Sequence, residues 1–572
     1  MCGILVFKTD NLTDEAKKKF RSSLEDLRNR GPDELKIIQN KNLLVGFTRL
    51  SINNIKNGSQ PFKSLCGKYI IVFNGEIINY KELVKDLKQK KIKVKYGHEA
   101  EVIINLYILY GNKCVNFLRG FFAFVIIKTD TNDIFAAVDR FSIKPLYYVH
   151  NEKRKIFILT SDYSVLIRHG LLEKKINFNK IIDYFALARD FNDQTIFIGL
   201  KKLMASTILI KKKNYEKTFK YWAPFTNYKN TITDYDNSID ILHEKFLEVT
   251  RLWNVAETKT SLCLSSGLDS QTLNYYFDAN KINISRFNLI ENKQKFFNYD
   301  STTKIKLNSE KIISLLNEFT KKCINPFPVA HSSCTSLFQL YFFLSNKNFK
   351  FTLNGEGADE LYGGYARYKR QLNLIRKKNL TFQDSIIEIY KKDIKNLCFS
   401  LKKDQQKQIK NKLIEKILSV KLCSHKIENK ILEFDQISWI PVLIQRHDLI
   451  GMNYGLEVRP PYLDHEFVDL CNSLPVNLKY NFSKNKIILK KLLNEKFNYK
   501  STYKKQGTPN IFEKILNNKN EMKNFKESLL NGELSKFFNC KKIFEEIINN
   551  YKEKNHIFLW RLYILNKMLS NF

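Results

Sequence analysis

The stretch TSLCLSSGLDSQTLNYYF, residues 260–277, decides the expected fold of the second half of the chain. Residues 260–264 have the length and apolar character of a buried strand, and residues 271–277 have helical spacing. The Ser- and Gly-rich loop between them would bring backbone N–H groups and a helix N-terminus to one point, which favours an anion. A Ser-Gly loop is also a common turn, and this one lacks the Lys-Ser/Thr pair of a Walker loop.

The same arrangement recurs at FKFTLNGEGADELYGGY, residues 349–365. Residues 349–353 are strand-like, and packing alone does not explain the Gly- and acid-rich run that follows them. Because open α/β sheets bind ligands at the carboxyl ends of their strands, we expect the two loops to form one site. The sequence therefore predicts that Asp269 and Asp359 share a magnesium ion on the phosphates of a nucleotide.

Residues 1–190 have the pattern of a domain of short strands with two clear helices. Apolar and β-branched runs predict strands at 4–7, 43–47, 69–73, 122–127 and 134–138. Residues 129–133 have the composition of a hairpin loop between the last two of these strands. Apolar residues at helical spacing predict helices at 80–91 and 101–110.

The start of the chain, Met1-Cys2-Gly3-Ile4, contains a candidate nucleophile. Removal of Met1 would leave Cys2 with a thiol and a free α-amine, and the amine can take the thiol proton directly or through a water. The plain alternative is that Cys2 is an early residue of a buried strand. The choice depends on whether other groups suited to amide hydrolysis accompany the thiol.

Polar clusters in the first domain provide such groups. An Asn-Gly pair is usually a turn, but Asn74 and Gly75 can also offer two N–H donors to one oxyanion. Arg49 can hold a carboxylate at two points, and Glu76 can hold an ammonium group. A thiol, an oxyanion hole and a clamp for carboxylate and ammonium together predict hydrolysis of a free amino-acid amide, namely glutamine.

At this point the first domain resembles a known family. The segments CGI (2–4), RGPD (30–33), NGEI (74–77) and DRFSIKPLYY (139–148) resemble the glutaminase half of glutamine-dependent asparagine synthetases, which are class II glutamine amidotransferases with an N-terminal-nucleophile fold. The resemblance implies that Cys2 is the nucleophile and that Asn74 and Gly75 form the oxyanion hole. The glutamine-binding residues that it implies are Arg49, Asn74, Gly75, Glu76 and Glu99. Glu99 stands where the family has aspartate.

The second half resembles the PP-loop ATP pyrophosphatase half of the same family. The resemblance includes both loops and the segments QRHDLIGM (445–452), LEVRPPYLDH (456–465) and KQG (505–507). It implies that ATP, with Mg²⁺, adenylates a carboxylate and releases pyrophosphate, and that Glu356 serves the second half-reaction. The implied ATP-binding residues are Leu264, Ser265, Ser266, Gly267, Asp269, Ser270, Leu289, Asn354, Gly355 and Lys505. Ser266 stands where the family usually has glycine.

The chain of 572 residues is too long for one core. We predict an α+β glutaminase domain of αββα layers over residues 1–190 and a connector over residues 191–225. An α/β PP-loop synthetase domain with a helical C-terminal extension would occupy residues 226–572. The expected partners are glutamine and a small carboxylate acceptor. The sequence leaves the oligomeric state open, with a homodimer as one candidate.

The preferred acceptor is aspartate, giving asparagine, AMP, pyrophosphate and glutamate. The alternative keeps this chemistry on another carboxylate, for example a sugar acid in surface-polysaccharide modification. It is favoured by residues 325–343, which contain no Arg or Lys where the family has an aspartate-binding arginine. A fixed cation for a dicarboxylate would then have to come from elsewhere, with Arg367 and Arg459 as candidates.

A third reading, a basic nucleic-acid-associated protein with degenerate catalytic domains, follows from the net charge of +37. The excess is lysine spread along the whole chain together with other residues that have A/T-rich codons, which favours codon bias over a functional anionic partner. The joint presence of Cys2, Asn74, Gly75, Asp269 and Asp359 argues against degeneration. No signal peptide or membrane-spanning stretch is expected, and we predict a cytoplasmic enzyme.

Overall fold

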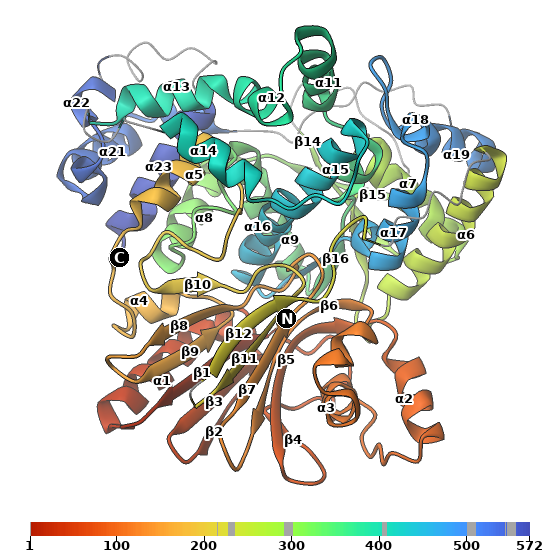
Figure 1. Ribbon diagram of the computed structural model, residues 1–572, viewed down its shortest axis with the longest axis vertical. Helices are drawn as coiled ribbons and strands as arrows, with labels where there is room; N and C mark the ends of the chain where they lie inside the picture. Colours follow the sequence, from red (N-terminus) through yellow and green to blue (C-terminus); the bar gives the residue numbers. More distant parts are fainter. Residues whose placement is uncertain are drawn as a thin grey trace.

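The computed structural model describes residues 2–213, 215–226, 235–290, 301–402, 406, 409–499, 511–543, 545 and 556–572. The strand-rich N-terminal half forms the lower part of the molecule in Figure 1, and the helix-rich C-terminal half lies on top of it. The fold is therefore a stack of two domains.

The N-terminal domain contains two six-stranded sheets, with strand orders β10-β8-β9-β1-β3-β2 and β12-β11-β7-β6-β5-β4. All strand pairs in both sheets are antiparallel. The strands are β1 (Gly3–Thr9), β2 (Glu34–Asn40), β3 (Leu43–Arg49), β4 (Phe62–Lys63), β5 (Tyr69–Ile77), β6 (Gly120–Lys128), β7 (Ile134–Val138), β8 (Tyr147–Asn151), β9 (Ile156–Thr160), β10 (Leu200–Lys202), β11 (Thr207–Lys212) and β12 (Tyr215–Lys220). The five predicted strands are confirmed: four are longer than expected, and β7 has the predicted bounds.

Alternating side chains give these sheets two buried faces. In β1, Ile4 and Val6 enter the core between the sheets, whereas Leu5 and Phe7 pack under helices on the outer face. The first sheet is covered by α1 (Asp14–Asp26), α4 (Ser164–Arg168) and α5 (Phe178–Ala186), and the second by α2 (Tyr80–Gln89) and α3 (Glu99–Tyr110). The result is the expected αββα order of layers.

The segment 191–225 differs from the connector expected there. It supplies β10 to the first sheet and β11 and β12 to the second. β11 pairs with β7, and this pairing buries Ile208 and Leu209 on the two faces of the sheet. The strands belong here because β7 would otherwise be an open edge beside a buried core.

The C-terminal domain is built on one parallel sheet with the strand order β15-β14-β13-β16-β17. Its strands are β13 (Ser261–Cys263), β14 (Ser285–Ile290), β15 (Thr302–Lys306), β16 (Phe351–Leu353) and β17 (Glu457–Arg459). The chain runs from β13 outward to β14 and later returns to β16 on the other side of β13. The loops after β13 and β16 therefore lie at a switch point of the sheet, where such folds bind ligands.

Helices surround this sheet and extend beyond it (Figure 1). Those near the sheet are α6 (Tyr235–Trp253), α7 (Leu268–Ala279), α8 (Ser309–Lys322), α9 (Thr335–Asn346), α10 (Ala358–Tyr362), α16 (Ile440–Met452), α17 (His465–Ser473), α18 (Val476–Lys479) and α19 (Ile487–Phe497). The helical extension contains α11 (Ala366–Lys378), α12 (Phe382–Ile389), α13 (Lys391–Ser400), α14 (Ile409–Leu418), α15 (Ile427–Ser438), α20 (Phe512–Leu516), α21 (Lys519–Asn531), α22 (Cys540–Lys542) and α23 (His556–Ser570). Helix α23 is a core element, because Trp560 is fully buried and donates to the carbonyl of Val329 at 2.7 Å.

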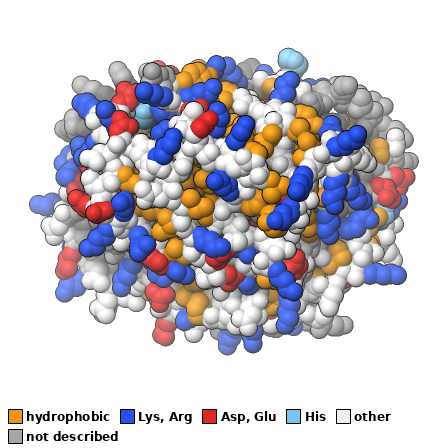
Figure 2. Space-filling model, turned by 90° about the horizontal axis from the view of Figure 1, so that it is seen from below, with side chains coloured by type: hydrophobic (Ala, Val, Ile, Leu, Met, Phe, Trp, Pro, Cys, Tyr) orange, Lys and Arg blue, Asp and Glu red, His pale blue; other side chains and the backbone are white. Residues whose placement is uncertain are grey.

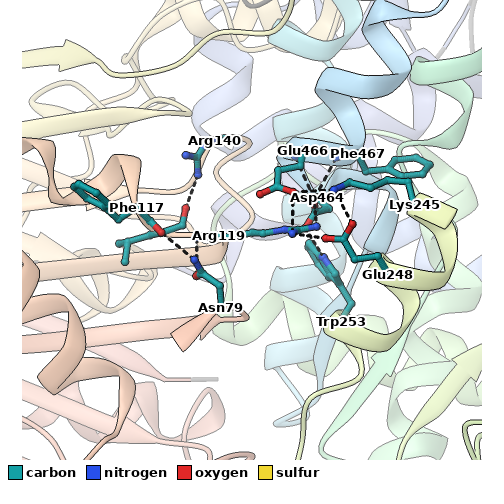
Figure 3. Close-up of polar contacts among 11 residues, drawn as sticks. Asn79, Phe117, Arg119, Arg140, Lys245, Glu248, Trp253, Asp464, Glu466 and Phe467 are labelled. Carbon is teal, nitrogen blue, oxygen red and sulfur yellow. Dashed lines mark hydrogen bonds and ion pairs between the residues drawn. The ribbon is translucent and has the colours of Figure 1, made fainter. Parts of the chain in front are cut away.

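A buried arginine joins the two domains. Arg119, next to the start of β6, reaches into the C-terminal domain and binds Asp464 through Nε at 2.8 Å and Nη2 at 3.0 Å (Figure 3). Its Nη1 also lies 2.6 Å from a carboxylate oxygen of Glu248. Asp464 in turn accepts from the indole of Trp253 at 3.0 Å. This two-point ion pair fixes the domains relative to one another.

The face of the molecule shown in Figure 2 carries its positive charge without a single dominant stripe. On the face shown in Figure 2, Lys and Arg side chains are scattered among neutral and apolar ones. No helix among the described residues is long and apolar enough to span a membrane. The scattered charge does not by itself indicate a groove for nucleic acid.

Candidate functional site

The first site lies around Cys2, at the start of β1. Its backbone N–H donates to Asn74 Oδ1 at 2.9 Å, which ties the start of β1 to β5 in the opposite sheet. A pocket opens here whose lining residues include Cys2, Arg49, Gly75, Glu76 and Glu99. The structure therefore brings together the residues that the sequence predicted for glutamine hydrolysis, although they are up to 97 positions apart.

The Asn74-Gly75 pair lies inside β5 and is not a turn. Asn74 is fully buried, and its Nδ2 has no hydrogen-bond partner among the described residues. The N–H groups of Phe73 and Ile77 both point away from β6, to Gln60 and Glu99, so the alternation of the strand turns the Gly75 N–H the same way. Asn74 Nδ2 and the Gly75 N–H are thus the two candidate donors of an oxyanion hole near Cys2, and this role stays a prediction.

Gly75 is required by a close backbone approach. Its φ is +138°, and a Cβ there would lie 2.0 Å from the carbonyl oxygen of Phe121. Any side chain would push β5 away from β6, and with it Asn74 and Glu76. Glycine at this position is what allows the strand to bend beside the pocket.

Two carboxyl groups share one end of the pocket. Glu99 accepts from the backbone N–H of Ile77 at 2.8 Å, and Glu76 accepts from Asn53 Nδ2 at 2.6 Å. Burial raises the pKa of Glu99 well above its usual range, and the charge of Glu76 raises it further. Burial also raises the pKa of Glu76, although Arg459 of the other domain opposes this. The pair is therefore suited to hold one proton or one bound ammonium group.

Arg49 lies in the pocket at the end of β3 but is partly engaged. Three of its N–H groups bind the carbonyl oxygens of Asn53, Asn54 and Ile55 at 3.3, 2.7 and 3.1 Å. A guanidinium carries five N–H donors, so two are left over from these three bonds. Arg49 shapes the loop that closes the pocket, and its grip on a substrate carboxylate stays a prediction.

The Cys2 thiol is neutral at rest. Burial raises its pKa, while the Leu50 backbone N–H and the charge of Arg49 act in the opposite direction. A buried thiol needs a base before it can attack, because the thiolate is the nucleophile.

The second site is at the switch point of the parallel sheet. The loop after β13 is closed by Ser270, whose hydroxyl accepts from the Ser265 N–H at 3.0 Å and lies 2.9 Å from the Ser265 hydroxyl. Gly267 precedes α7 and donates to Ser265 Oγ at 3.1 Å. Leu264 is buried at the end of β13, and Ser266 is half-buried. The loop thus leads directly into the N-terminus of α7.

The loop after β16 meets this first loop through Gly355. A Cβ at Gly355 would lie 3.0 Å from Cβ of Asp269 and 3.1 Å from the Ser270 nitrogen. Asn354 donates its backbone N–H to the Arg459 carbonyl at 3.0 Å, which holds the loop on β17. The predicted convergence of the two loops is therefore observed, and glycine allows their close approach.

Asp269 and Asp359 face the same cation. Each lies in the first turn of a helix, α7 or α10, and the Lys486 ammonium group binds both carboxylates. A Cβ at Gly364 would collide with Asp359 and Lys486, so the cradle has no room for a larger residue. Two carboxylates that share a single positive charge fit the oxygen ligands that Mg²⁺ prefers.

Glu356 lies beside these carboxylates and is itself paired. Its Oε1 is 3.0 Å from Arg446 Nη2 and 2.9 Å from His447 Nε2, both on α16. Leu289 is half-buried near the carboxyl end of β14, at the same edge of the sheet as the two loops. Lys505, the remaining predicted ATP-binding residue, lies outside the described residues.

The two arginines considered for a dicarboxylate acceptor are both engaged. Arg367 pairs with Asp435 and lies over the Tyr365 ring at 3.8 Å. Arg459 is fully buried and pairs with Glu457 at 2.6 Å and with Glu76 at 3.4 Å. Arg459 therefore faces the glutamine pocket.

Sequence reasoning missed Lys486 and His447. Lys486 lies 217 positions after Asp269, in a lysine-rich segment where nothing distinguishes it from its neighbours. His447 lies inside the QRHD segment, but its spacing to Glu356 does not show that the two touch. In both cases only the fold brings the partners together.

Comparisons with known proteins agree with this geometry. Residues 1–222 match the family described as glutamine amidotransferase domain, and residues 244–570 match the family described as asparagine synthase. Asparagine synthetase [glutamine-hydrolyzing] 3 of Bacillus subtilis is 24% identical over 529 residues, covering 86% of this chain and 84% of the relative. Asparagine synthetase [glutamine-hydrolyzing] 1 of the same organism is 25% identical over 539 residues, with the same coverage.

A solved structure of glutamine phosphoribosylpyrophosphate amidotransferase from B. subtilis is 15% identical, covers 50% of this chain and 65% of its own, and has a TM-score of 0.29. At this score the likeness adds nothing to the topology described above. The two family matches and the full-length relatives decide the assignment. The chain belongs to the asparagine synthase family and is a glutamine-hydrolysing, asparagine synthase-type enzyme.

Proposed function

We propose that this enzyme forms asparagine from aspartate, with glutamine as nitrogen donor and ATP as activator, through an aspartyl-adenylate. One observation carries the proposal: two loops meet at Gly355 and bring Asp269, Asp359 and Glu356 to one edge of the sheet. The same chain holds Cys2 beside Asn74 in a separate pocket. A source of ammonia and a site for activating a carboxylate are thus combined in one molecule.

Glutamine hydrolysis begins at Cys2. The Cys2 nitrogen, which becomes an α-amine once Met1 is removed, takes the thiol proton, and the sulfur attacks the side-chain amide of glutamine. Asn74 Nδ2 and the Gly75 N–H receive the developing oxyanion. Glu76 and Glu99 hold the glutamine ammonium group, and Arg49 offers its free N–H groups to the carboxylate. The C–N bond of the amide then breaks, and ammonia leaves with the proton that the α-amine took from the thiol. Water finally releases glutamate from the thioester.

Activation occurs at the second site, where the substrate is ATP. Asp269 and Asp359 hold Mg²⁺, which would supply positive charge to the phosphates. The N-terminus of α7, together with the loop of residues 265–267 that leads into it, binds phosphate oxygens. Leu264, Leu289, Asn354 and Gly355 contact the nucleoside, and the family resemblance assigns Lys505 to the phosphates or the adenylate. The acceptor carboxylate attacks the α-phosphorus and pyrophosphate leaves.

Amide formation follows at Glu356. Ammonia attacks the acyl carbon of the adenylate, AMP leaves, and Glu356 accepts the proton that the nitrogen loses. A carboxylate is suited to this step because the nitrogen becomes strongly acidic as it bonds to carbon.

A second acceptor class is favoured by a specific observation. Residues 325–343 contain no Arg or Lys, and Arg367 and Arg459 already have acidic partners. A less charged carboxylate, such as a sugar acid, needs no further cation. The reaction would then keep the same two half-reactions on a different acid.

One experiment separates the acceptors. The enzyme is supplied with ATP, Mg²⁺ and glutamine labelled at the amide nitrogen, together with aspartate or a panel of sugar acids. Labelled asparagine with aspartate-dependent release of pyrophosphate is the expected result. Labelled sugar amide without asparagine would move the assignment to the second class. Release of label as ammonia, with no pyrophosphate from any acid, would contradict both, and salt-sensitive DNA binding would then favour the nucleic-acid reading.

A further inference from the structure

Among the residues that the structure describes, Glu356 is held on one side only. Both of its bonds, from Arg446 and from His447, end on Oε1. Its side chain is 27% exposed, so Oε2 is the oxygen left to meet a ligand. A carboxylate held in this way presents one oxygen in a fixed direction.

The opposite nitrogen of His447 contacts the hydroxyl group of Tyr341, on α9. Both side chains are buried, at 4% and 1% exposure. Burial raises the pKa of Tyr341 well above its usual range, so the phenol keeps its proton and donates it to Nδ1. The imidazole must then carry its own proton on Nε2, the nitrogen that faces Glu356.

Burial also lowers the pKa of His447, and the nearby Arg446 lowers it further, while Glu356 opposes them. In its neutral form the imidazole has Nε2–H as its single donor, 2.9 Å from Glu356 Oε1, and Arg446 Nη2 lies 3.2 Å from the same nitrogen. The three side chains form a directed chain of hydrogen bonds from Tyr341 through His447 to Glu356. Their elements are far apart in sequence, since 91 positions separate Glu356 from His447 and 106 separate His447 from Tyr341.

From this geometry we infer that His447, oriented by Tyr341, is a positioning residue for amide transfer: its Nε2–H holds Oε1 of Glu356 so that Oε2 faces the attacking ammonia. The inference rests on the proposed function and adds two residues to it. A buried histidine with a purely structural role would end its bonds on other buried groups. Here His447 Nε2–H donates to Glu356, whose carboxylate is partly exposed to the site.

Attack of ammonia on the acyl-adenylate needs no proton from His447. The nitrogen lone pair forms the C–N bond, and the electrons of the acyl C–O bond leave with AMP. One N–H proton passes to Oε2 of Glu356. His447 keeps its proton throughout and contributes direction, because a misplacement of about 1 Å at a reacting group costs about 100-fold in rate.

The pH dependence distinguishes this role from simple packing. Besides Arg446 and His447, the titratable groups that face Glu356 are Tyr341 on α9, Asp359 and Glu360 on α10, Cys263 on β13 and Tyr365. Burial would raise the pKa of Glu356, but His447 and then Arg446 lower it to about 2. Without the imidazole donor the effect of burial remains, so the pKa of Glu356 rises. Glu356 then becomes protonated at a higher pH, and in that form it cannot accept a proton from the nitrogen.

The test uses His447→Leu, His447→Gln and Tyr341→Phe in the full-length enzyme. Amide formation from ammonia is measured against pH, next to ATP–pyrophosphate exchange and glutaminase activity. His447→Leu should slow amide formation about 100-fold and move its acidic limb to higher pH, with the other two activities within about threefold of wild type. His447→Gln, which keeps an N–H donor, should restore part of the rate. Tyr341→Phe should have a smaller effect in the same direction.

His150→Leu is the matched control, because it removes another His–Glu contact, with Glu216 at 2.7 Å, in the N-terminal domain. It should leave amide formation unchanged. Equal rates and equal pH profiles for His447→Leu and wild type would overturn the inference but not the proposed function. So would parallel loss of all three activities in His447→Leu and His447→Gln, because that is the signature of a structural role. Absence of ATP–pyrophosphate exchange and amide formation in the wild type would overturn the proposed function, and the inference with it.

Discussion

The two sites of this molecule handle charge in opposite ways. In the glutamine pocket, Asn74 leaves a buried donor unpaired, and the carboxyl groups of Glu76 and Glu99 lie together. In the nucleotide site the carboxylates already hold internal cations: Lys486 lies between Asp269 and Asp359, and Arg446 binds Glu356.

The difference follows from what each site has to bind. A pocket for glutamine needs preformed donors and an ammonium acceptor, and it can keep them in a rigid sandwich of sheets. The second site, for which we propose a metal and a triphosphate, has to bind several charges at once, and ion pairs within the protein offset the charges of its own carboxylates. The first site is preorganised by polar groups that can bind a substrate directly. The second site is preorganised by ion pairs within the protein.

The largest expected effect tests the first site alone. Cys2→Ala removes the thiol, and glutamine hydrolysis should fall on the order of 10⁴-fold or more, because no other nucleophile replaces it. Ammonia-dependent amide formation should remain close to wild type, since Glu356 and the nucleotide site are separate. Cys66→Ala, at an exposed cysteine, is the control. Glutaminase activity that survives in Cys2→Ala would refute the nucleophile assignment.

The next effect tests the second site. Asp269→Asn and Asp359→Asn each remove a charge proposed to hold the metal, and each should slow ATP–pyrophosphate exchange by about 10²-fold to 10³-fold. Glutaminase activity should stay measurable in both, because the pocket around Cys2 is unaffected. Asp130→Asn, on the exposed loop between β6 and β7, serves as control. Normal exchange in both variants would rule out a shared metal.

A smaller effect concerns the connection between the two sites. Arg119→Met breaks the buried ion pair with Asp464 and should lower the free energy of unfolding by about 2 kcal/mol. Trp253, which donates to Asp464, reports the loss through its fluorescence during urea unfolding (Figure 3). Arg28→Met removes an exposed pair with Glu25 and should change nothing measurable. Equal stability of the two variants would show that Arg119 does not join the domains.

The smallest expected effect is a change in how steeply the free energy of unfolding depends on pH. The pKa of Glu99 is raised by burial and by Glu76, so the folded state holds this proton more tightly than the unfolded chain does. Its contribution to stability is complete below the ordinary glutamate pKa of about 4.3 and is lost as pH rises through the raised value.

Glu99→Gln supplies a neutral amide of the same shape, and its Oε1 can still accept from Ile77. The decline in the free energy of unfolding between pH 5 and pH 8 should therefore be shallower than in wild type. Glu25→Gln, at an exposed carboxylate, should follow the wild-type curve. An unchanged slope in Glu99→Gln would mean that the carboxyl pair does not share a proton.

Much of the fold was accessible from local pattern. The continuous apolar runs of β1 and β6 and the strand–loop–helix pattern at residues 260–277 are each determined within a few neighbours. The strands at 200–220 were not, because β10 to β12 are short and mostly polar, and only pairing with distant strands stabilises them. The Asn74-Gly75 pair likewise looks like a turn until β6 pairs with it.

The sequence by itself determined the residue types for both half-reactions: Cys2, Asn74, Gly75, Asp269, Asp359 and Glu356. Only the tertiary structure decided which charges face one another. Lys486 reaches the two aspartates, His447 reaches Glu356, and Arg459 reaches Glu76, each across tens to hundreds of positions. The physical reason is that a periodic pattern records which face of an element is buried, whereas a buried polar contact depends on how distant elements dock.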